Sequence, residues 1–347
     1  MLSEDGSTAT ERLLALPKAE LHVHLDGSLR PSTMAELAQE RGTELPSYEA
    51  RSLAAHMLVS DAHSLEEYLE RFVLTLSVMQ DAEALERIAF EVAEDHAREH
   101  VRYLEVRFSP ALCTAGGLTT DEVMDHVLAG LRRAESAYQI KTRVIVCALR
   151  TLDPAVSVEM AELAVAYRDR GVVAFDLAGA EAGSPAREHL EAFRLVESAG
   201  LPLTIHAGEG FGAPSIKQAV NDAHATRIGH GTRLWEDVEL ETQVRERGIP
   251  LEVCLTSNVQ TGVAASYAMH PVRRYFDEGI PIALCTDNRL MSGVTLTKEY
   301  EHARDHLGFT WKELKTVART GFEVAYLPED EKREMLAGVD EETGRPE

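Results

Sequence analysis

Residues 20–27 read Glu-Leu-His-Val-His-Leu-Asp-Gly, so two histidines, His22 and His24, end a short apolar run. In a β-strand, residues i and i+2 point to the same side, and both imidazoles are therefore expected to project into one space. Two imidazole nitrogens aimed at one point suit a metal ion such as Zn²⁺, which takes nitrogen ligands at about 2.0–2.1 Å. A His-x-His pair in an arbitrary strand is more often structural, so the interpretation depends on the rest of the chain.

Further runs of β-branched or apolar residues follow the first one along the chain. Most are nearly continuously apolar, as in parallel strands that are buried on both faces. Helix-like stretches with charged faces lie between them, for example at residues 158–170 and 188–199. The predicted strands are residues 19–24, 101–108, 142–149, 172–177, 203–206, 226–229, 251–254 and 282–286.

This alternation of strand and helix predicts an α/β fold, the (β/α)8 TIM barrel. Right-handed crossovers between successive strands give a parallel sheet, and eight such units close into a barrel. An open doubly wound sheet is the alternative, but no Gly-x-Gly-x-x-Gly turn follows the first run. We expect one barrel domain over residues 1–347, with a core at about residues 13–335 and polar termini.

The stretch between the first two runs, about residues 30–100, is too long for a single helix. It predicts several extra helices inserted after the first strand. Leu65, Tyr68, Leu69 and Phe72 mark one of them, with the i, i+3, i+4, i+7 spacing of an apolar helix face. This helix either packs on the barrel or forms a lid whose apolar underside covers a pocket.

Composition and charge exclude several classes of partner. The chain of 347 residues has 35 Lys and Arg against 58 Asp and Glu, a formal net charge of −23. A field of this sign repels phosphate backbones and anionic membrane surfaces, so neither nucleic acid nor a membrane is expected as a partner. No apolar stretch approaches the roughly 18 residues of a membrane span. Because residues 1–12 also lack the apolar core of a signal peptide, we expect a cytoplasmic protein.

Several predicted strands end in residues that bind metals or transfer protons. In a (β/α)8 barrel the carboxyl ends of the strands meet over one opening. Three imidazoles and one carboxylate suit Zn²⁺ with one position left for water. A bridged pair of metals would need another anionic ligand, such as a modified lysine at the end of the fourth run, and no lysine stands there. We therefore predict one Zn²⁺ per chain, with the ligands His22, His24, His206 and Asp287.

Other polar residues near these ends supply acid–base chemistry. Zinc lowers the pKa of its bound water to about 7, so hydroxide forms at neutral pH. His230 is left over as a general base or an electrostatic partner for that water, and Glu209 can donate or shuttle a proton. His96 and His100 have the i, i+4 spacing that can clamp a metal on a helix, but we interpret them as solvated surface residues.

These residues stand in specific motifs. Residues 22–27 read His-Val-His-Leu-Asp-Gly, residues 206–209 read His-Ala-Gly-Glu and residues 229–231 read Gly-His-Gly. Together they resemble the adenosine deaminase family of the metal-dependent amidohydrolase superfamily, and the resemblance extends over about residues 13–335. The other matching segments are residues 17–28, 105–110, 171–179, 286–287 and 327–332.

The resemblance implies a zinc enzyme that hydrolytically removes ammonia from C6 of adenosine or 2′-deoxyadenosine in purine salvage, giving inosine or 2′-deoxyinosine. It assigns zinc to the same four ligands and the protonation of purine N1 to Glu209. His230 would orient and deprotonate the water with help from Asp287, and Ser257 would support His230. The implied contacts with a small-molecule purine nucleoside are His24, Asp26 at a ribose hydroxyl, the backbone N–H of Gly179 at purine N3, and Asn288.

Asn288 is a departure from the commonest family pattern, which has a second aspartate there that must be protonated to donate to purine N7. An asparagine NH₂ donates without proton uptake, so purine recognition can survive. Free adenine and aminodeoxyfutalosine stay open as substrates, although a ribose contact from Asp26 is useless for a free base. A non-catalytic nucleoside-binding protein is the alternative from another class, and the complete set of predicted ligands argues against it. No oligomeric state follows from these patterns.

Overall fold

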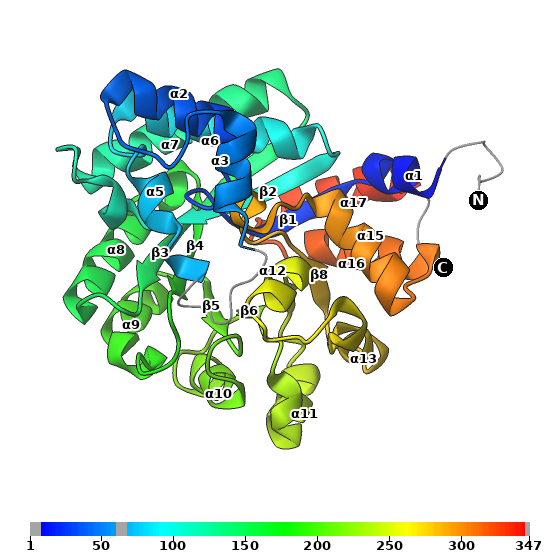
Figure 1. Ribbon diagram of the computed structural model, residues 1–347. Helices are drawn as coiled ribbons and strands as arrows, with labels where there is room; N and C mark the ends of the chain where they lie inside the picture. The colour runs from blue at the N-terminus through cyan, green and yellow to red at the C-terminus, as the bar shows by residue number, and fades with distance from the viewer. Residues whose placement is uncertain (1–7, 60–67, 344–347) are drawn as a thin grey trace.

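The computed structural model describes residues 8–59 and 68–343, and within them eight parallel strands form one sheet in the order of the sequence (Figure 1). Each predicted strand is present, and the bounds agree within about two residues. The last two are shorter than predicted, since Cys254, Cys285 and Thr286 lie beyond them. The strands are β1 Lys18–His24, β2 Val101–Phe108, β3 Lys141–Leu149, β4 Val172–Ala178, β5 Leu203–Ala207, β6 Arg227–His230, β7 Leu251–Val253 and β8 Ile282–Leu284.

The first and last strands approach one another and nearly close the barrel. The chain after β8 lies parallel to β1, with a bridge between Val23 and Asp287. The backbone N–H of His24 donates to the Asp287 carbonyl, and the Asp287 N–H donates to the His22 carbonyl, each across 2.8 Å. The predicted (β/α)8 barrel is therefore confirmed, and its closure brings two segments far apart in the sequence together at the predicted metal ligands.

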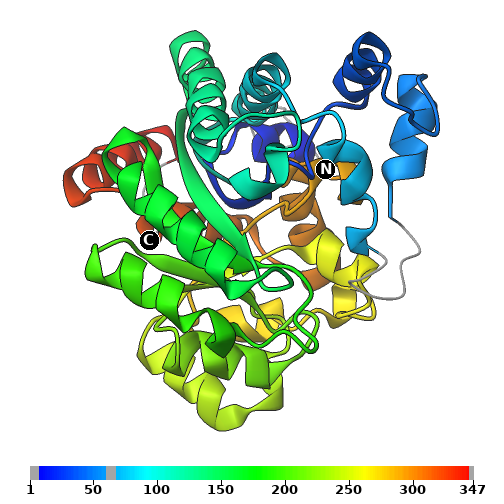
Figure 2. The ribbon, with the colours of Figure 1, turned by 90° about the vertical axis from the view of Figure 1, so that its left-hand side faces the viewer.

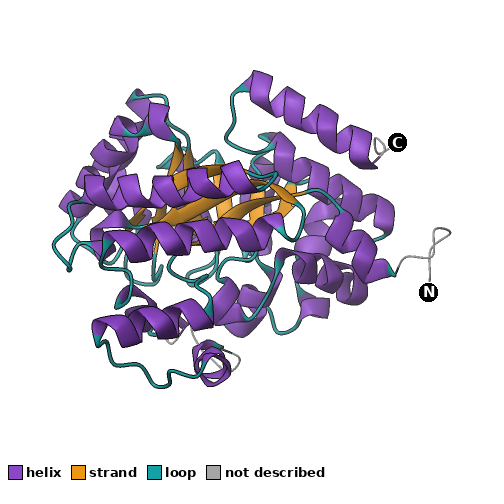
Figure 3. Ribbon diagram, turned by 90° about the horizontal axis from the view of Figure 1, so that it is seen from above, coloured by secondary structure: helices purple, strands orange, loops and turns teal. Residues whose placement is uncertain are grey.

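Helices surround the strands (Figure 3). The capping residues explain where several of them begin. At the start of α7, the Thr119 hydroxyl accepts the backbone N–H of Glu122, and the Glu122 carboxylate accepts the N–H of Thr119. This reciprocal pair satisfies two donors that a helix end otherwise leaves free. The helices between strands are α7 Thr120–Ala137, α8 Pro154–Ala166, α9 Leu190–Ser198, α10 Ala213–Asn221, α11 Val238–Glu246, α12 Leu255–Gln260 and α13 Val272–Asp277.

The segment between β1 and β2 contains the extra helices that its length predicts. In Figure 2 they are drawn in shades from blue to teal, in the upper part of the view. Tyr68 and Leu69 are helical, but a turn at residues 70 and 71 separates them from Phe72, and Leu65 lies outside the described residues. The described helices of this insertion are α2 Pro31–Arg41, α3 Ala50–Met57, α5 Phe72–Leu76 and α6 Ala82–Ala97.

The remaining helices lie at the two ends of the chain. The described part of the chain contains no helix long and apolar enough to cross a membrane. α15 contacts both α1 and α16, and α16 also packs against β1, β8 and α17. These end helices are α1 Ala9–Ala15, α14 Arg289–Ser292, α15 Leu296–Leu307, α16 Trp311–Glu323 and α17 Glu329–Thr343.

The barrel interior contains a buried network of charged side chains. Arg107 donates to Asp176 Oδ2 across 3.0 Å and to Glu252 Oε2 across 2.7 Å. Arg227 donates from Nε to Glu252 Oε1 across 2.6 Å and also pairs with Glu105. All five side chains are at most 1% exposed. Buried charges are tolerated only when they are paired and hydrogen-bonded, and here each carboxylate is paired with a guanidinium.

Candidate active site

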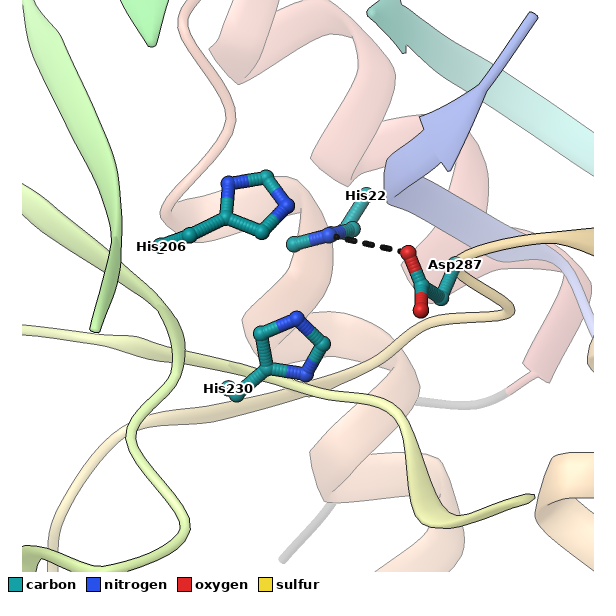
Figure 4. Close-up of side chains that lie close together, drawn as sticks. All are labelled: His22, His206, His230 and Asp287. Atoms are coloured by element: carbon teal, nitrogen blue, oxygen red, sulfur yellow. Dashed lines mark ion pairs between the residues drawn. The ribbon is translucent and has the colours of Figure 1, made fainter. Parts of the chain in front are cut away.

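Four histidines and one aspartate converge at the carboxyl end of the barrel. Figure 4 shows His22, His206, His230 and Asp287 pointing toward one another from β1, β5, β6 and the segment after β8. His22 Nε2 and His24 Nε2 each lie 3.4 Å from Asp287 Oδ1. His24 Nε2 also lies 3.0 Å from His206 Nε2. The structure therefore brings together the predicted ligands, and it adds His230 to the same cluster.

The protonation of these rings leaves nitrogen lone pairs available. Burial lowers the pKa of His24, His206 and His230 below the ordinary value for imidazole, so these rings are neutral. His22 Nε2 is buried and finds no hydrogen-bond partner among the described residues. Nitrogens that face each other at 3.0 Å, beside a buried unpaired nitrogen and a carboxylate, form a donor set that fits a divalent metal.

Two carboxylates fix the orientation of two of these rings from inside the barrel. His22 Nδ1 lies 2.8 Å from Glu252 Oε2, and His206 Nδ1 lies 3.0 Å from Asp176 Oδ2. A carboxylate at Nδ1 holds the proton there and directs the Nε2 lone pair toward the metal position. Burial alone would raise the pKa of Glu252, but the Arg107 and Arg227 guanidiniums hold it well below its ordinary value.

This support from the barrel interior was missed by the sequence analysis. Asp176 and Arg107 lie in matching motifs of the resemblance, which gives them no role, and Glu252 lies in a predicted apolar strand. A charged residue inside an otherwise apolar strand was the available signal, because such a residue must find a buried partner.

The His230 ring contacts Asn258, not Ser257 as predicted. Asn258 Nδ2 donates to His230 Nδ1 across 3.0 Å, while Asn258 Oδ1 accepts from the Thr232 hydroxyl across 2.7 Å and lies 3.2 Å from His270 Nε2. The Ser257 hydroxyl has no hydrogen-bond partner among the residues that the structure describes. With Nδ1 as acceptor, the neutral His230 ring carries its proton on Nε2, which lies 3.5 Å from Glu209 Oε2.

A cavity opens beside this cluster and contains the predicted purine and ribose contacts. Glu209 lines it, and its Oε1 accepts from the Thr261 hydroxyl across 3.3 Å. Burial raises the pKa of Asp26 to about 7, and its Oδ1 is unpaired within the described part of the chain. The lining residues are His24, Asp26, Tyr68, Leu69, Phe72, Leu112, Leu149, Thr151, Ala178, Gly179, Ala180, His206, Glu209, His230, Asp287 and Asn288.

The Asn288 side chain fits only because residue 27 is glycine. A Cβ added to Gly27 would lie 1.8 Å from Asn288 Oδ1. That oxygen is buried and has no hydrogen-bond partner in residues 8–59 and 68–343. The Asn288 amide therefore lies at the cavity wall with Oδ1 packed against Gly27.

Apolar residues of the insertion form one wall of the cavity. Tyr68, Leu69 and Phe72 all line it, and the Phe72 ring lies 6.4 Å from the His24 ring, edge to face. The Tyr68 hydroxyl lies 2.9 Å from Ser292 Oγ, which ties this wall to the segment after β8. The position of this apolar face beside the cavity favours the lid over a helix that only packs on the barrel.

The prediction that His96 is a solvated surface residue is wrong. The ring is fully buried, and Nδ1 lies 2.7 Å from the Val92 carbonyl while Nε2 lies 3.8 Å from Glu20 Oε2. α6 carries many charged residues, but His96 is on its buried side, near Glu20 of β1. His100 is partly buried and lies outside α6, with a φ of 59°.

Comparison with known proteins agrees with this geometry. The family model described as adenosine deaminase matches residues 17–342. The adenosine deaminase of Mycobacteroides abscessus is 45% identical over 341 residues, with 93% of this chain and 94% of that protein covered. The chain belongs to the adenosine deaminase family. It also matches a probable adenosine deaminase of Dictyostelium discoideum, 41% identical over 94% of this chain, of whose length it spans 42%.

Solved structures of the family share the fold. The structure of Arabidopsis ADAL with GMP is 30% identical with a TM-score of 0.87, covering 96% of this chain and 99% of that one. The adenine deaminase of Arthrobacter aurescens is 25% identical with a TM-score of 0.87, covering 94% and 98%. A Burkholderia ambifaria amidohydrolase with bound Zn is 27% identical with a TM-score of 0.87, covering 98% and 95%.

Family membership confirms the predicted family and the predicted class of enzyme, a hydrolase that acts on carbon–nitrogen bonds. The family is metal-dependent, and the cluster of histidines with Asp287 is the part of the described chain that fits a metal ion.

Proposed function

We propose that this enzyme catalyses the hydrolytic deamination of adenosine and 2′-deoxyadenosine to inosine and 2′-deoxyinosine, with release of ammonia, in purine salvage. The observation that carries the proposal is the position of Glu209: its carboxylate lines the same cavity as the histidine cluster and as Asp26. A metal position, an acid and a ribose contact around one cavity match what nucleoside deamination requires.

One Zn²⁺ per chain would be held by three imidazole nitrogens and one carboxylate. When bound, the ion supplies water activated for attack at neutral pH. The buried, unpaired His22 Nε2 and the 3.0 Å separation of His24 Nε2 from His206 Nε2 support these three imidazoles as ligands. His230 lies in the same cluster, and we assign it to the water because Asn258 donates to its Nδ1. The proposed ligands are His22, His24, His206 and Asp287.

Glu209 would protonate purine N1, which makes C6 electrophilic. The Thr261 hydroxyl donates to Oε1, and Oε2 is the oxygen on the His230 side. His230 would act as a donor through Nε2–H that orients the attacking water, because Asn258 donates to its Nδ1. Asp287 would align that water from the other side.

The substrate contacts follow from the cavity wall. The backbone N–H of Gly179 would meet purine N3, and the Asn288 NH₂ would donate to N7 without any proton uptake. The unpaired, buried Asp26 Oδ1 fits a ribose hydroxyl as its donor. His24 would contact the substrate beside the metal.

These contacts favour a nucleoside over free adenine and over a nucleotide, the ligand classes named for two of the similar solved structures. Free adenine would leave the buried Asp26 oxygen unpaired, which costs about 1–3 kcal/mol. A nucleotide phosphate would find no lysine or arginine among the described residues that line the cavity, where three carboxylates already gather. Aminodeoxyfutalosine stays the second candidate, because Asn288 departs from the common family pattern.

Direct assay separates these substrates. The zinc-loaded protein is incubated with adenosine, 2′-deoxyadenosine, adenine, AMP and aminodeoxyfutalosine, and each reaction is followed by ultraviolet absorbance and ammonia release. We expect rapid loss of adenosine and 2′-deoxyadenosine and at most slow loss of the others. Turnover of another 6-aminopurine while adenosine is untouched would keep the chemistry and refute the proposed substrate.

A further inference from the structure

Glu181 lies in the loop after β4 and binds the loop after β5. Its Oε1 accepts the backbone N–H groups of Glu209 and Gly210 across 2.8 and 3.0 Å, and its Oε2 accepts the N–H of Gly208 across 3.0 Å. The residue is buried, with 2% of its surface exposed. Successive backbone N–H groups that point to one side form an anion-binding concavity, and here the chain fills it with its own carboxylate.

The central amide of the three belongs to the proposed acid itself. Gly208 has a φ of 81°, so the chain turns sharply just before Glu209. A side chain there would also collide with Ile216, since a Cβ would lie 2.4 Å from its Cδ1. With its own N–H bound by Glu181, the Glu209 backbone has a fixed direction, and its side chain extends into the cavity beside His230.

The loop that carries Glu181 also carries the second proposed purine contact. Gly179 lies two residues before Glu181 in the loop after β4 and lines the cavity. N1 and N3 flank C2 on the six-membered ring of a purine. Glu181 therefore joins the backbone that carries the proposed N1 acid to the backbone that carries the proposed N3 donor.

A buried cation accompanies this carboxylate. Arg150 donates from Nη2 to the His206 carbonyl across 2.6 Å and from Nη1 to the Ser184 carbonyl across 3.2 Å. It thus binds backbone on both sides of the junction between the two loops. Together, Arg150 and Glu181 hold the ends of β4 and β5 in one arrangement without occupying the cavity, since neither is among its lining residues.

We propose that Glu181 is a positioning residue of the deamination reaction, which sets the direction of the Glu209 side chain relative to the Gly179 N–H. The inference rests on the proposed function, because the role of Glu209 as the N1 acid belongs to it. A misplacement of about 1 Å at a reacting group can cost about 10²-fold in rate. Glu181 acts through Glu209 and not on zinc, so its loss should lower kcat more than it raises KM.

Glu181→Gln is the informative substitution, because an amide keeps the shape but replaces one acceptor oxygen by an NH₂ that faces N–H donors. We expect kcat for adenosine to fall about 10²-fold, with zinc content unchanged. By hydrogen–deuterium exchange, the amides of residues 208–210 should exchange faster than in the parent. Unchanged kcat, or unchanged exchange at these amides, would overturn the proposal.

A double-mutant cycle distinguishes positioning from a general loss of structure. In a Glu209→Gln background the acid is already gone, so adding Glu181→Gln should lower the residual rate little further. A full additional loss in that background would show that Glu181 does not act through Glu209. If the unsubstituted protein fails to deaminate adenosine at all, the proposed function has failed first, and the exchange measurement still reports on the loop contact.

Two further variants guard against misfolding. Glu181→Asp keeps the charge but is one methylene shorter, so we expect an intermediate loss of kcat, and a parental kcat in it would overturn the proposal even if Glu181→Gln does not fold. Glu135→Gln is the matched control at the other end of the barrel, where Glu135 Oε1 accepts the backbone N–H of Thr142 across 2.6 Å. It should leave kcat at the parental value.

Discussion

Asn258 Nδ2 donates to His230 Nδ1 across 3.0 Å, and this single contact decides which nitrogen of the catalytic-site imidazole carries the proton. Asn258 is itself fixed, because its oxygen accepts from the Thr232 hydroxyl. A neutral ring that accepts at Nδ1 must be protonated at Nε2, the nitrogen on the side of Glu209. In this tautomer we expect His230 to orient the attacking water as a hydrogen-bond donor, and the predicted deprotonation of that water by His230 would require the ring proton to be on Nδ1.

Asn258→Asp should reverse this arrangement. An aspartate accepts from Nδ1–H, which moves the ring proton away from Nε2 and removes the donor. We expect kcat to fall by about 10²-fold, as when one donor to a reacting oxygen is deleted, with zinc content unchanged by elemental analysis. Ser257→Ala is the neighbouring control, and it should keep the parental kcat because the Ser257 hydroxyl makes no hydrogen bond within the described residues. A higher kcat in Asn258→Asp would instead identify His230 as a general base.

Glu209→Gln should abolish proton donation while preserving the shape of the site. The amide cannot protonate purine N1, so we expect kcat to fall by about 10²–10⁴-fold, the range for loss of a general acid. Zinc content and the thermal midpoint of unfolding should stay at the parental values, because Glu209 is not a proposed ligand. Steady-state kinetics with adenosine and zinc analysis on the same sample provide the check. Parental turnover would exclude its role as the acid.

Asp287→Ala should release the metal. Asp287 Oδ1 lies 3.4 Å from Nε2 of both His22 and His24, and it is the one carboxylate of the proposed ligand set. After dialysis against a weak chelator, we expect the variant to hold much less than one zinc per chain, while the parent keeps it. Asn288→Ala changes the adjacent residue and should retain zinc, so full occupancy in both variants would contradict the ligand assignment.

The strands and their ends could be predicted because their signal is local. A parallel strand buried on both faces is a continuous apolar run, and residues placed at its carboxyl end, such as His206 or Asp287, meet over the barrel opening whatever their separation in sequence. The residue of a helix that faces the site was harder to predict. Ser257 and Asn258 are neighbours on α12, so one helical step, about 100°, decides which of them faces His230.

Contacts within the barrel interior could not be predicted from runs of residues. Arg107 joins Glu252 and Asp176, which are 145 and 69 residues away from it. The choice of partners follows from the order and register of the strands. These depend on several strands together and cannot be deduced from the sequence of one strand alone. The burial of His96 could not be predicted for the same reason. The sequence of α6 is rich in charged residues, and it does not show that the His96 ring lies near Glu20 of β1.

Glu299 should make stability depend on pH in a direction opposite to that of most carboxylates. It is fully buried, with both carboxylate oxygens near the backbone N–H of Thr256 at 3.2 and 3.3 Å. Burial raises its pKa from 4.5 to about 8. The folded state therefore keeps a proton that the unfolded state loses, and the stability due to this group is present below about pH 4.5 and is lost as pH rises toward about 8.

Glu299→Gln removes this dependence, because the amide accepts from Thr256 without titrating. We expect the free energy of unfolding of the variant minus that of the parent to increase by up to about 1.4 kcal/mol per pH unit between about pH 5 and 8. Urea unfolding at each pH, with zinc held at one concentration, measures it, and the subtraction cancels the pH dependence of zinc binding. Glu159→Gln changes an exposed residue of α8 and should show no such trend. A difference that is constant with pH would mean that Glu299 is ionised in the folded protein.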